Sequence, residues 1–297
     1  MRYSTQTLAL SKKIGIKGAV KAILDAGFSA LDMTMSYGEE RWALGEDYAS
    51  LANDLRKMAA DRGAVFNQAH APFGGGREFY TEKTAKNFPR IFEFAAMLGS
   101  ECIVVHPVTL DKYNGHEEEL FEINMDFYNR LLPYARDVGI KIAIENMWQE
   151  NEVKKIVPSV CHDSREHAKY FDALGNKDDV TLCLDVGHIA LAGANPAEAV
   201  KILGTRLGAT HIHDVDLVSD LHTMPGLGKI DWESLACALG EINYSGYLTL
   251  ECDKGYLKDV TEDTANEKLR NLRECVSMLG EKVDTYRKTV KNKEKTS

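Results

Sequence analysis

Short apolar runs alternate with longer amphipathic segments along the whole sequence. The short runs are typical of buried β-strands, and the longer segments have the apolar spacing of helices that pack on one face. Strands are predicted at residues 3–8, 30–34, 64–70, 101–106, 141–147, 180–185, 209–214 and 247–252. Helices are predicted at residues 16–26, 47–62, 82–98, 117–138, 164–174, 196–203, 231–242 and 262–279. Eight strand–helix units predict a single (β/α)8 TIM barrel, with its active site at the C-terminal ends of the strands.

The last three predicted strands separate apolar from polar side chains by alternation. One side carries Leu182, Leu184, Ile212, Leu248 and Leu250, and the other carries Asp185, His211, His213, Thr249 and Glu251. Apolar side chains on one face and charged side chains on the other, in strand after strand, indicate a parallel barrel with a polar mouth.

The composition predicts an ordinary soluble globular protein without a second domain. Of 297 residues, 44% are hydrophobic and 27% charged, and no linker-like stretch interrupts the pattern. We therefore predict one domain over residues 1–285, followed by a charged tail at residues 286–297 that frays. The formal net charge of −9 disfavours a partner held by its phosphate backbone, because few cations remain to neutralise it. Nucleic acid is therefore not expected as a partner.

The cysteines and the apolar runs indicate where in the cell the protein is located. The six cysteines form no CxxC pair, and three of them lie in predicted strands, as buried free thiols do. No apolar run approaches the roughly 20 residues that span a bilayer, and the first residues do not read as a signal peptide. These features predict a cytoplasmic protein with no membrane partner.

Residues that can bind metals or transfer protons stand at the ends of six consecutive predicted strands. In chain order they are His70, His106, Glu145, Asp185 with His188 beyond it, His211 with His213, and Glu251. Any one of these histidines alone is more typical of a hydrogen-bonded core residue. Three carboxylates buried together would be costly, however, and these strand ends contain no basic residue to neutralise them. A divalent cation with imidazole ligands removes that objection.

The loop after the seventh predicted strand adds further candidates. It contains Asp220 and His222, followed by Gly226 and Gly228, and it can fold over the barrel mouth. Trp148 follows Glu145 closely, and can either stack on a sugar face or pack under a loop. Trp42 has the same two interpretations. No glycine-rich nucleotide-binding motif occurs in the sequence.

Five motifs of the chain resemble the xylose-isomerase-like barrel superfamily. They are IENMW, LDVGHIALAG, HIHDVD, DLHTMPGLGKIDW and YLTLEC. That superfamily contains sugar (phosphate) isomerases and epimerases, inosose dehydratases and metal-dependent apurinic-site endonucleases. In the isomerase and epimerase branch, the resemblance implies a single metal held by Glu145, Asp185, His211 and Glu251, with His188 contacting the substrate.

The same positions also resemble the three-zinc site of the endonucleases. The matching residues are His70, His106, Glu145, Asp185, His188, His211, Asp220, His222 and Glu251. Charge favours the sugar branch, because residues 211–228 contain no Lys or Arg, whereas a DNA-binding mouth would be basic. The arginine that ketose 3-epimerases carry shortly after the seventh-strand histidine is also missing. Other loops could supply a cation for a phosphorylated substrate through Arg41, Arg77 or Lys112.

The resulting prediction is a metal-dependent sugar isomerase or epimerase acting on a ketose, aldose or inosose through an enediolate. Glu145 and Glu251 are the predicted acid and base. Mn²⁺ is the first choice of metal, one ion per chain, with Mg²⁺, Co²⁺ or Zn²⁺ as alternatives, because three carboxylates make an oxygen-rich shell. The predicted substrate contacts are His188, His222, His106, His70 and Trp148. An inosose-type dehydratase and a zinc endonuclease stay open as alternatives, and a homo-oligomer is compatible with the sequence.

Overall fold

The computed structural model describes residues 1–73, 86–175 and 178–296. Eight parallel strands form one sheet: β1 (Arg2–Gln6), β2 (Ala30–Thr34), β3 (Val65–His70), β4 (Cys102–Val105), β5 (Lys141–Glu145), β8 (Val180–Asp185), β9 (Leu207–His211) and β10 (Tyr247–Leu250). The sheet curls into a ring in the order β10-β1-β2-β3-β4-β5-β8-β9. A parallel bridge between Ile212 and Leu250 joins the last two strands and closes the ring. The predicted (β/α)8 barrel is therefore confirmed.

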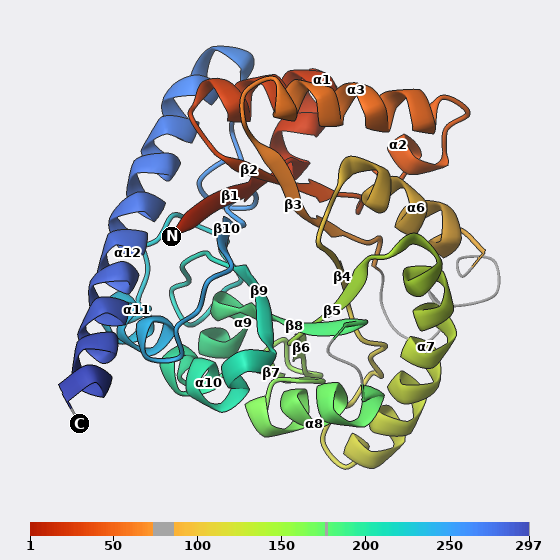
Figure 1. Ribbon diagram of the computed structural model, residues 1–297. Coiled ribbons are helices and arrows are strands. Elements are labelled where there is room, and N and C mark those ends of the chain that lie inside the picture. The colour runs from red at the N-terminus through yellow and green to blue at the C-terminus, as the bar shows by residue number, and fades with distance from the viewer. Residues whose placement is uncertain (74–85, 176–177, 297) are drawn as a thin grey trace.

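Helices follow the strands and surround the ring (Figure 1). They are α1 (Leu8–Asp25), α2 (Arg41–Leu44), α3 (Tyr48–Ala60), α6 (Phe88–Leu98), α7 (Glu117–Val138), α8 (Ser164–Leu174), α9 (Val186–Leu191), α10 (Pro196–Leu203), α11 (Trp232–Glu241) and α12 (Glu262–Thr296), with a short 3-10 turn at Gly204–Arg206. Two short antiparallel strands, β6 (Trp148–Glu150) and β7 (Ile156–Pro158), form a hairpin in the loop after β5.

The apolar side of each strand packs against the helices, and the other side fills the barrel. Leu182, Leu184 and Leu248 belong to the large core between strands and helices. A second, small cluster inside the barrel consists of Cys102, Val104, Ala143, Cys183 and Ala209. Because side chains alternate, the residues that follow these on the inner face are polar, and they face the C-terminal end of the barrel.

A polar layer inside the barrel joins strands that are distant in the sequence. In the pairing of β2 with β3 the register shifts after Leu31, which leaves Asn67 as an extra residue in β3. The side chain of Asn67 accepts a hydrogen bond from Ser4 Oγ at 2.6 Å and donates one to Thr249 Oγ1 at 3.2 Å. This bulge places two adjacent side chains, Asn67 and Gln68, in the same polar network.

Local signals set most of the element boundaries. Gly99 and Gly139 end α6 and α7 in the left-handed conformation, with φ of 87° and 72°. Asp231 caps α11 by accepting a hydrogen bond from Ser234 N at 3.0 Å. The predicted range 117–138 is α7 itself.

Other boundaries differ from the prediction. Helix α1 begins at Leu8 instead of residue 16 and contains a non-helical residue, Gly15. Helix α12 continues past residue 279 to Thr296 and so includes the segment predicted as a tail. The pattern also missed α2, α9 and the β6–β7 hairpin, which are too short to show periodicity. Part of the predicted helix 82–98 lies outside the described residues, and α6 begins at Phe88. Among the described helices, none is long and apolar enough to cross a membrane.

Candidate functional site

A polar pocket of about 160 Å³ lies at the C-terminal end of the strands. It is lined by Leu8, Thr34, Tyr37, His70, Phe73, His106, Glu145, Met147, Trp148, His188, Asp220, His222, Glu251, Asp253 and Lys254. All five residues predicted as substrate contacts, and both predicted catalytic glutamates, are in this lining. Residues at or beyond the C-terminal end of each barrel strand contribute to it, as the barrel architecture predicts.

Glu145, at the end of β5, lies at the centre of a group of imidazoles. Its Oε1 accepts a hydrogen bond from His211 at 2.9 Å, and its Oε2 lies 2.8 Å from His106 Nε2 and 3.5 Å from His70 Nε2. The rings of His70 and His106 also touch, with 3.1 Å between their Nε2 atoms. The ring of Phe73 stacks on His106 at 4.1 Å between centroids. Four strands thus contribute to one buried cluster.

Three carboxylates converge on one nitrogen of His211. Nδ1 lies 2.9 Å from Glu145 Oε1, 2.9 Å from Glu251 Oε2 and 3.8 Å from Asp185 Oδ2. One N–H cannot satisfy three carboxylates, and Glu251 Oε2 accepts no hydrogen bond from any residue that the structure describes. Burial would raise the pKa of Glu145, but the imidazoles of His211 and His106 hold it well below its usual range.

Asp185 is fixed by partners on three sides. It caps α9 by accepting a hydrogen bond from His188 N at 2.7 Å. Its backbone exchanges two hydrogen bonds with the side chain of Asn146, at 2.8 and 3.0 Å, and this ties the end of β8 to the end of β5. His213, two residues beyond the end of β9, contacts its carboxylate. Asp185 is fully buried.

The donor set of Glu145, Asp185, His211 and Glu251 fits a divalent cation. One ligand atom from each of the four lies within 4.8 Å of the others. A cation would bind the buried Oε2 atom of Glu251, which accepts no hydrogen bond from the described residues. It would also neutralise the three carboxylates that share a single N–H group of His211. His70 lies beside this set and forms a second possible group with Glu145 and His211.

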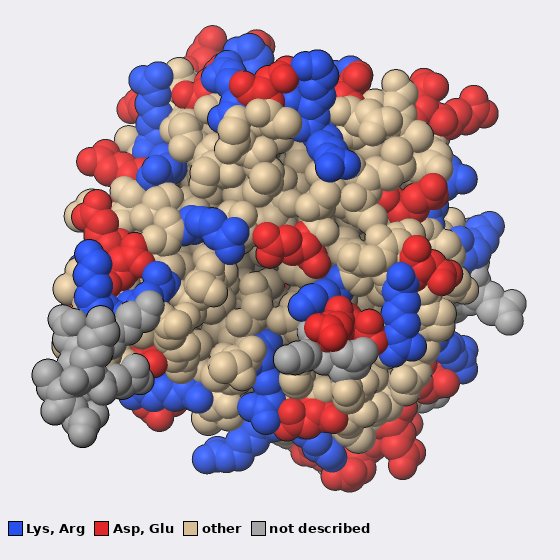
Figure 2. Space-filling model, in the orientation of Figure 1, with Lys and Arg blue, Asp and Glu red and all other residues tan. Residues whose placement is uncertain are grey.

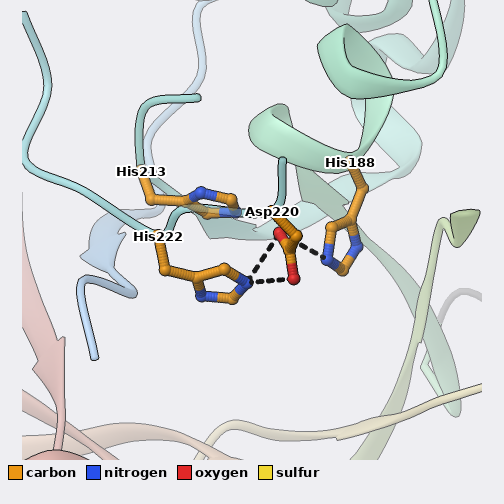
Figure 3. Close-up of side chains that lie close together, drawn as sticks. All are labelled: His188, His213, Asp220 and His222. Carbon is orange, nitrogen blue, oxygen red and sulfur yellow. Dashed lines mark hydrogen bonds and ion pairs between the residues drawn. The ribbon is translucent and has the colours of Figure 1, made fainter. Parts of the chain in front are cut away.

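A second group of imidazoles lies next to the first, and Figure 3 shows its four members. His213 and His222 stack at 4.0 Å between ring centroids. Asp220 lies between His222 and His188: its Oδ1 is 3.0 Å from His222 Nε2 and 3.9 Å from His188 Nε2. His188 Nδ1 is 3.0 Å from the carbonyl oxygen of Asn146, and a hydrogen bond donated there leaves the Nε2 lone pair facing the pocket.

The loop that carries Asp220 and His222 is held by a buried carboxylate that sequence reasoning missed. Asp214 accepts hydrogen bonds from four donors: the backbone N–H groups of Val215, Gly226 and Ile230 and the indole N–H of Trp232, at 2.8–3.1 Å. A Cβ at Gly228 would lie 2.3 Å from Asp214 Oδ1. The PGLG sequence is therefore explained by close packing around Asp214.

The loop after β10 supplies a basic residue that sequence reasoning missed. Lys254 lines the pocket, and its Nζ is 2.5 Å from Asp220 Oδ2. The proposed alternative cations do not line the pocket: Arg41 pairs with Glu39 at 3.0 Å and Lys112 with Glu152 at 2.7 Å. Arg77 lies outside the described residues.

The two predicted tryptophan positions differ. Trp148 lines the pocket, with its ring 6.3 Å from that of His188. Trp42 lies outside the pocket and donates a hydrogen bond from Nε1 to Glu39 Oε2 at 3.0 Å.

Eight parallel strands with ligand-type side chains at their C-terminal ends define a TIM barrel, and comparison with known proteins identifies its family. Residues 20–275 match the model of the xylose isomerase-like TIM barrel family, and the chain belongs to this family. It is similar to the uncharacterized protein MJ1311 of Methanocaldococcus jannaschii, with 27% identity over 92% of both chains. It is also similar to inosose dehydratase of Clostridium botulinum, with 26% identity over 58% of this chain and 64% of the relative.

Solved structures have the same fold. A crystal structure of IOLI protein with a binding zinc atom superposes with a TM-score of 0.74 at 18% identity, and the match covers 96% of this chain and 99% of the other. Further matches are named D-psicose 3-epimerase and L-ribulose 3-epimerase. Relatives of this chain thus include proteins named as inosose dehydratase and as a sugar epimerase.

Proposed function

We propose that this protein is a divalent-metal-dependent isomerase or epimerase of a sugar or a related polyhydroxy carbonyl compound. The observation that carries the proposal is the convergence of three carboxylates on His211 Nδ1 at the base of a polar pocket. Glu145, Asp185, His211 and Glu251 are the proposed ligands of one metal ion. Three carboxylates and one imidazole favour Mn²⁺ over a structural zinc. The zinc atom bound by IOLI protein, which has the same fold, supports a divalent cation here.

The chemistry assigned to the residues is proton transfer at the carbon next to a carbonyl. A divalent cation, when bound, polarises the carbonyl group and stabilises the negative charge of the enediolate. Glu145 and Glu251 come from β5 and from the end of β10, and both line the pocket, so we assign them the roles of base and acid. We assign His188 and His222 to substrate hydroxyls, with His106, His70 and Trp148 as further contacts.

The same residues could also eliminate water. If the carbon β to the carbonyl carries a hydroxyl group, the second glutamate, in its carboxylic acid form, donates a proton to that hydroxyl, which leaves as water. The relatives named inosose dehydratase support this alternative. Zinc-dependent phosphodiester cleavage is the less favoured alternative. A surface that binds DNA would be basic, whereas Lys and Arg are interspersed with Asp and Glu on the face drawn in Figure 2.

The free thiols of all six cysteines suit a reducing cytoplasm, where we place the activity.

The test follows hydrogen exchange between substrate and solvent. A panel of ketoses, aldoses and inososes is incubated in D2O with the protein and Mn²⁺, and a substrate gains deuterium at the carbon α to its carbonyl. Glu145→Gln and Glu251→Gln are each expected to lower the exchange rate by about 100-fold or more. Glu152→Gln, at an exposed glutamate outside the pocket, is the matched control and should exchange at the wild-type rate. Full exchange in either pocket variant would refute the two-carboxylate mechanism. Formation of a product that has lost water, seen by NMR, would identify a dehydratase.

A further inference from the structure

The outer group of His188, His213, Asp220 and His222 has the composition of a zinc site. One ligand atom from each residue lies within 4.8 Å of the others. Three imidazoles and one carboxylate are ligands that Zn²⁺ binds in tetrahedral sites. The group adjoins the inner set through Asp185, which His213 contacts. From these four residues alone, a second metal ion would be expected.

A fifth residue contacts the atoms that such an ion would need. The ammonium group of Lys254 lies 2.5 Å from Asp220 Oδ2 and 3.1 Å from His222 Nε2. Lys254 comes from the loop after β10, 32 residues from His222 in sequence. Its side chain is 43% exposed, whereas that of Asp220 is 9% exposed. The lysine therefore reaches from the surface to a carboxylate that is largely shielded from solvent.

The contacts within the outer group also suit an ammonium partner. Asp220 and His222 touch each other, with 3.0 Å between Asp220 Oδ1 and His222 Nε2. The Nζ atom of Lys254 lies beside both side chains, and its nearest acceptor is Asp220 Oδ2. The ammonium group therefore donates to the carboxylate that a metal ion would need as a ligand.

We propose that Lys254 closes the outer group to metal, so that this protein carries a metal ion at the inner set and an ammonium group at the outer one. A divalent cation bound to Asp220 and His222 would lie against the ammonium group, and the two positive charges would repel each other in a poorly solvated site. Burial would lower the pKa of Lys254, but Asp220 raises it above its usual range, so the metal-free site holds an ammonium group. The sequence resembles a three-zinc site, but Lys254, which comes from another loop, occupies the position of the outer ion.

This inference rests on the proposed function only for the identity of the inner site. It predicts that variants of Lys254 differ from the wild type in the number of metal ions bound per chain. Metal per chain is measured by elemental analysis after equilibrium dialysis against Zn²⁺ in chelator-free buffer near neutral pH. Lys254→Met, which keeps an apolar chain of similar length, is expected to bind one equivalent more than the wild type. The double variant Lys254→Met/His222→Ala is expected to lose that extra equivalent.

Two further variants separate charge from folding. Lys254→Arg keeps a cation and should bind the wild-type number of ions. Lys258→Met removes an exposed lysine from the same loop and is the matched control. Circular dichroism and thermal unfolding establish that each variant is folded. If Lys254→Met unfolds, Lys254→Gln is substituted for it. Titration with Co²⁺ gives a second measurement, because a new site with imidazole ligands adds visible absorption.

The outcomes distinguish this inference from the proposed function. Equal metal content in the wild type and in Lys254→Met would overturn the inference. The inference would also be overturned if the single variant His222→Ala bound one equivalent of metal less than the wild type. A wild type without metal and a Lys254→Met variant with one equivalent would support the inference while contradicting the proposed function. One equivalent in the wild type and two in the variant would support both.

Discussion

The Nε2 atom of His213 lies 2.9 Å from Oδ1 and 3.0 Å from Oδ2 of Asp185. Both residues are fully buried, so the ring fixes the orientation of a carboxylate that is a proposed metal ligand. Partners of this kind typically change metal affinity by about 10–100-fold when they are removed. His213→Ala is therefore expected to weaken Mn²⁺ binding by about that factor, as measured by competition with a chromophoric chelator. His116→Ala, at an exposed histidine before α7, should bind like the wild type. Unchanged affinity in His213→Ala would show that Asp185 needs no support from this ring.

The position of the His213 ring depends on a glycine in α9. A Cβ at Gly187 would lie 2.0 Å from the Cε1 atom of His213, far inside van der Waals contact. Gly187→Ala is expected to lower the free energy of unfolding by about 1–3 kcal/mol through overpacking, as measured by urea denaturation. His213→Ala removes the clashing ring, so the double variant should be less destabilised than the sum of the two single variants. Additive losses would mean that the two residues do not compete for the same space.

The fold could be predicted from the sequence because the features that determine its strands and helices are local. Alternating apolar positions identify each strand, and glycines such as Gly139 mark the helix ends within one turn. The inner site was accessible for the same reason: residues at strand ends converge in any parallel barrel, whichever helices connect the strands. Glu145, Asp185 and His211 needed no knowledge of the loops.

The remaining features depend on contacts between loops. Lys254 meets Asp220 across 34 residues of sequence, and no periodicity indicates which loops touch. Asp214 looks like any other acidic residue until the chain returns at Gly226 and Trp232 to donate hydrogen bonds. Helix α9 is capped by the side chain of Asp185 and is only six residues long. Because it has fewer than two turns, its sequence cannot show an apolar stripe.

The buried carboxylate of Asp214 supports the loop that carries Asp220 and His222. In Asp214→Asn an amide group would face two of the four donors, leaving N–H groups without an acceptor. We expect a loss of about 1–3 kcal/mol in the free energy of unfolding. Faster hydrogen exchange of amides in residues 216–230 should accompany it, while Mn²⁺ affinity at the inner site is retained. Asp216→Asn is the control, because Asp216 accepts two backbone hydrogen bonds at the exposed surface and its loss should matter less. Wild-type exchange in Asp214→Asn would contradict this role.

His167 is expected to make the stability depend on pH. It is buried in α8, and its Nε2 donates a hydrogen bond to the carbonyl oxygen of Ile144 at 2.9 Å. Burial lowers the pKa of His167 to about 4, whereas an unfolded histidine titrates near 6.5. The unfolded chain therefore binds a proton at this residue before the folded chain does. The stability that His167 contributes is complete above about pH 6.5 and is lost as the pH falls towards 4, by up to about 3 kcal/mol.

The variant that tests this is His167→Gln, whose amide can donate the same hydrogen bond without titrating. Between pH 7 and pH 4 the variant should lose less stability than the wild type, and the difference should appear in urea denaturation curves across that range. The buried carboxylates titrate in both proteins, so their contribution cancels in the comparison. Parallel curves for the two proteins would show that His167 is protonated at the same pH whether the chain is folded or unfolded. In that case the hydrogen bond to Ile144 would not keep the ring neutral.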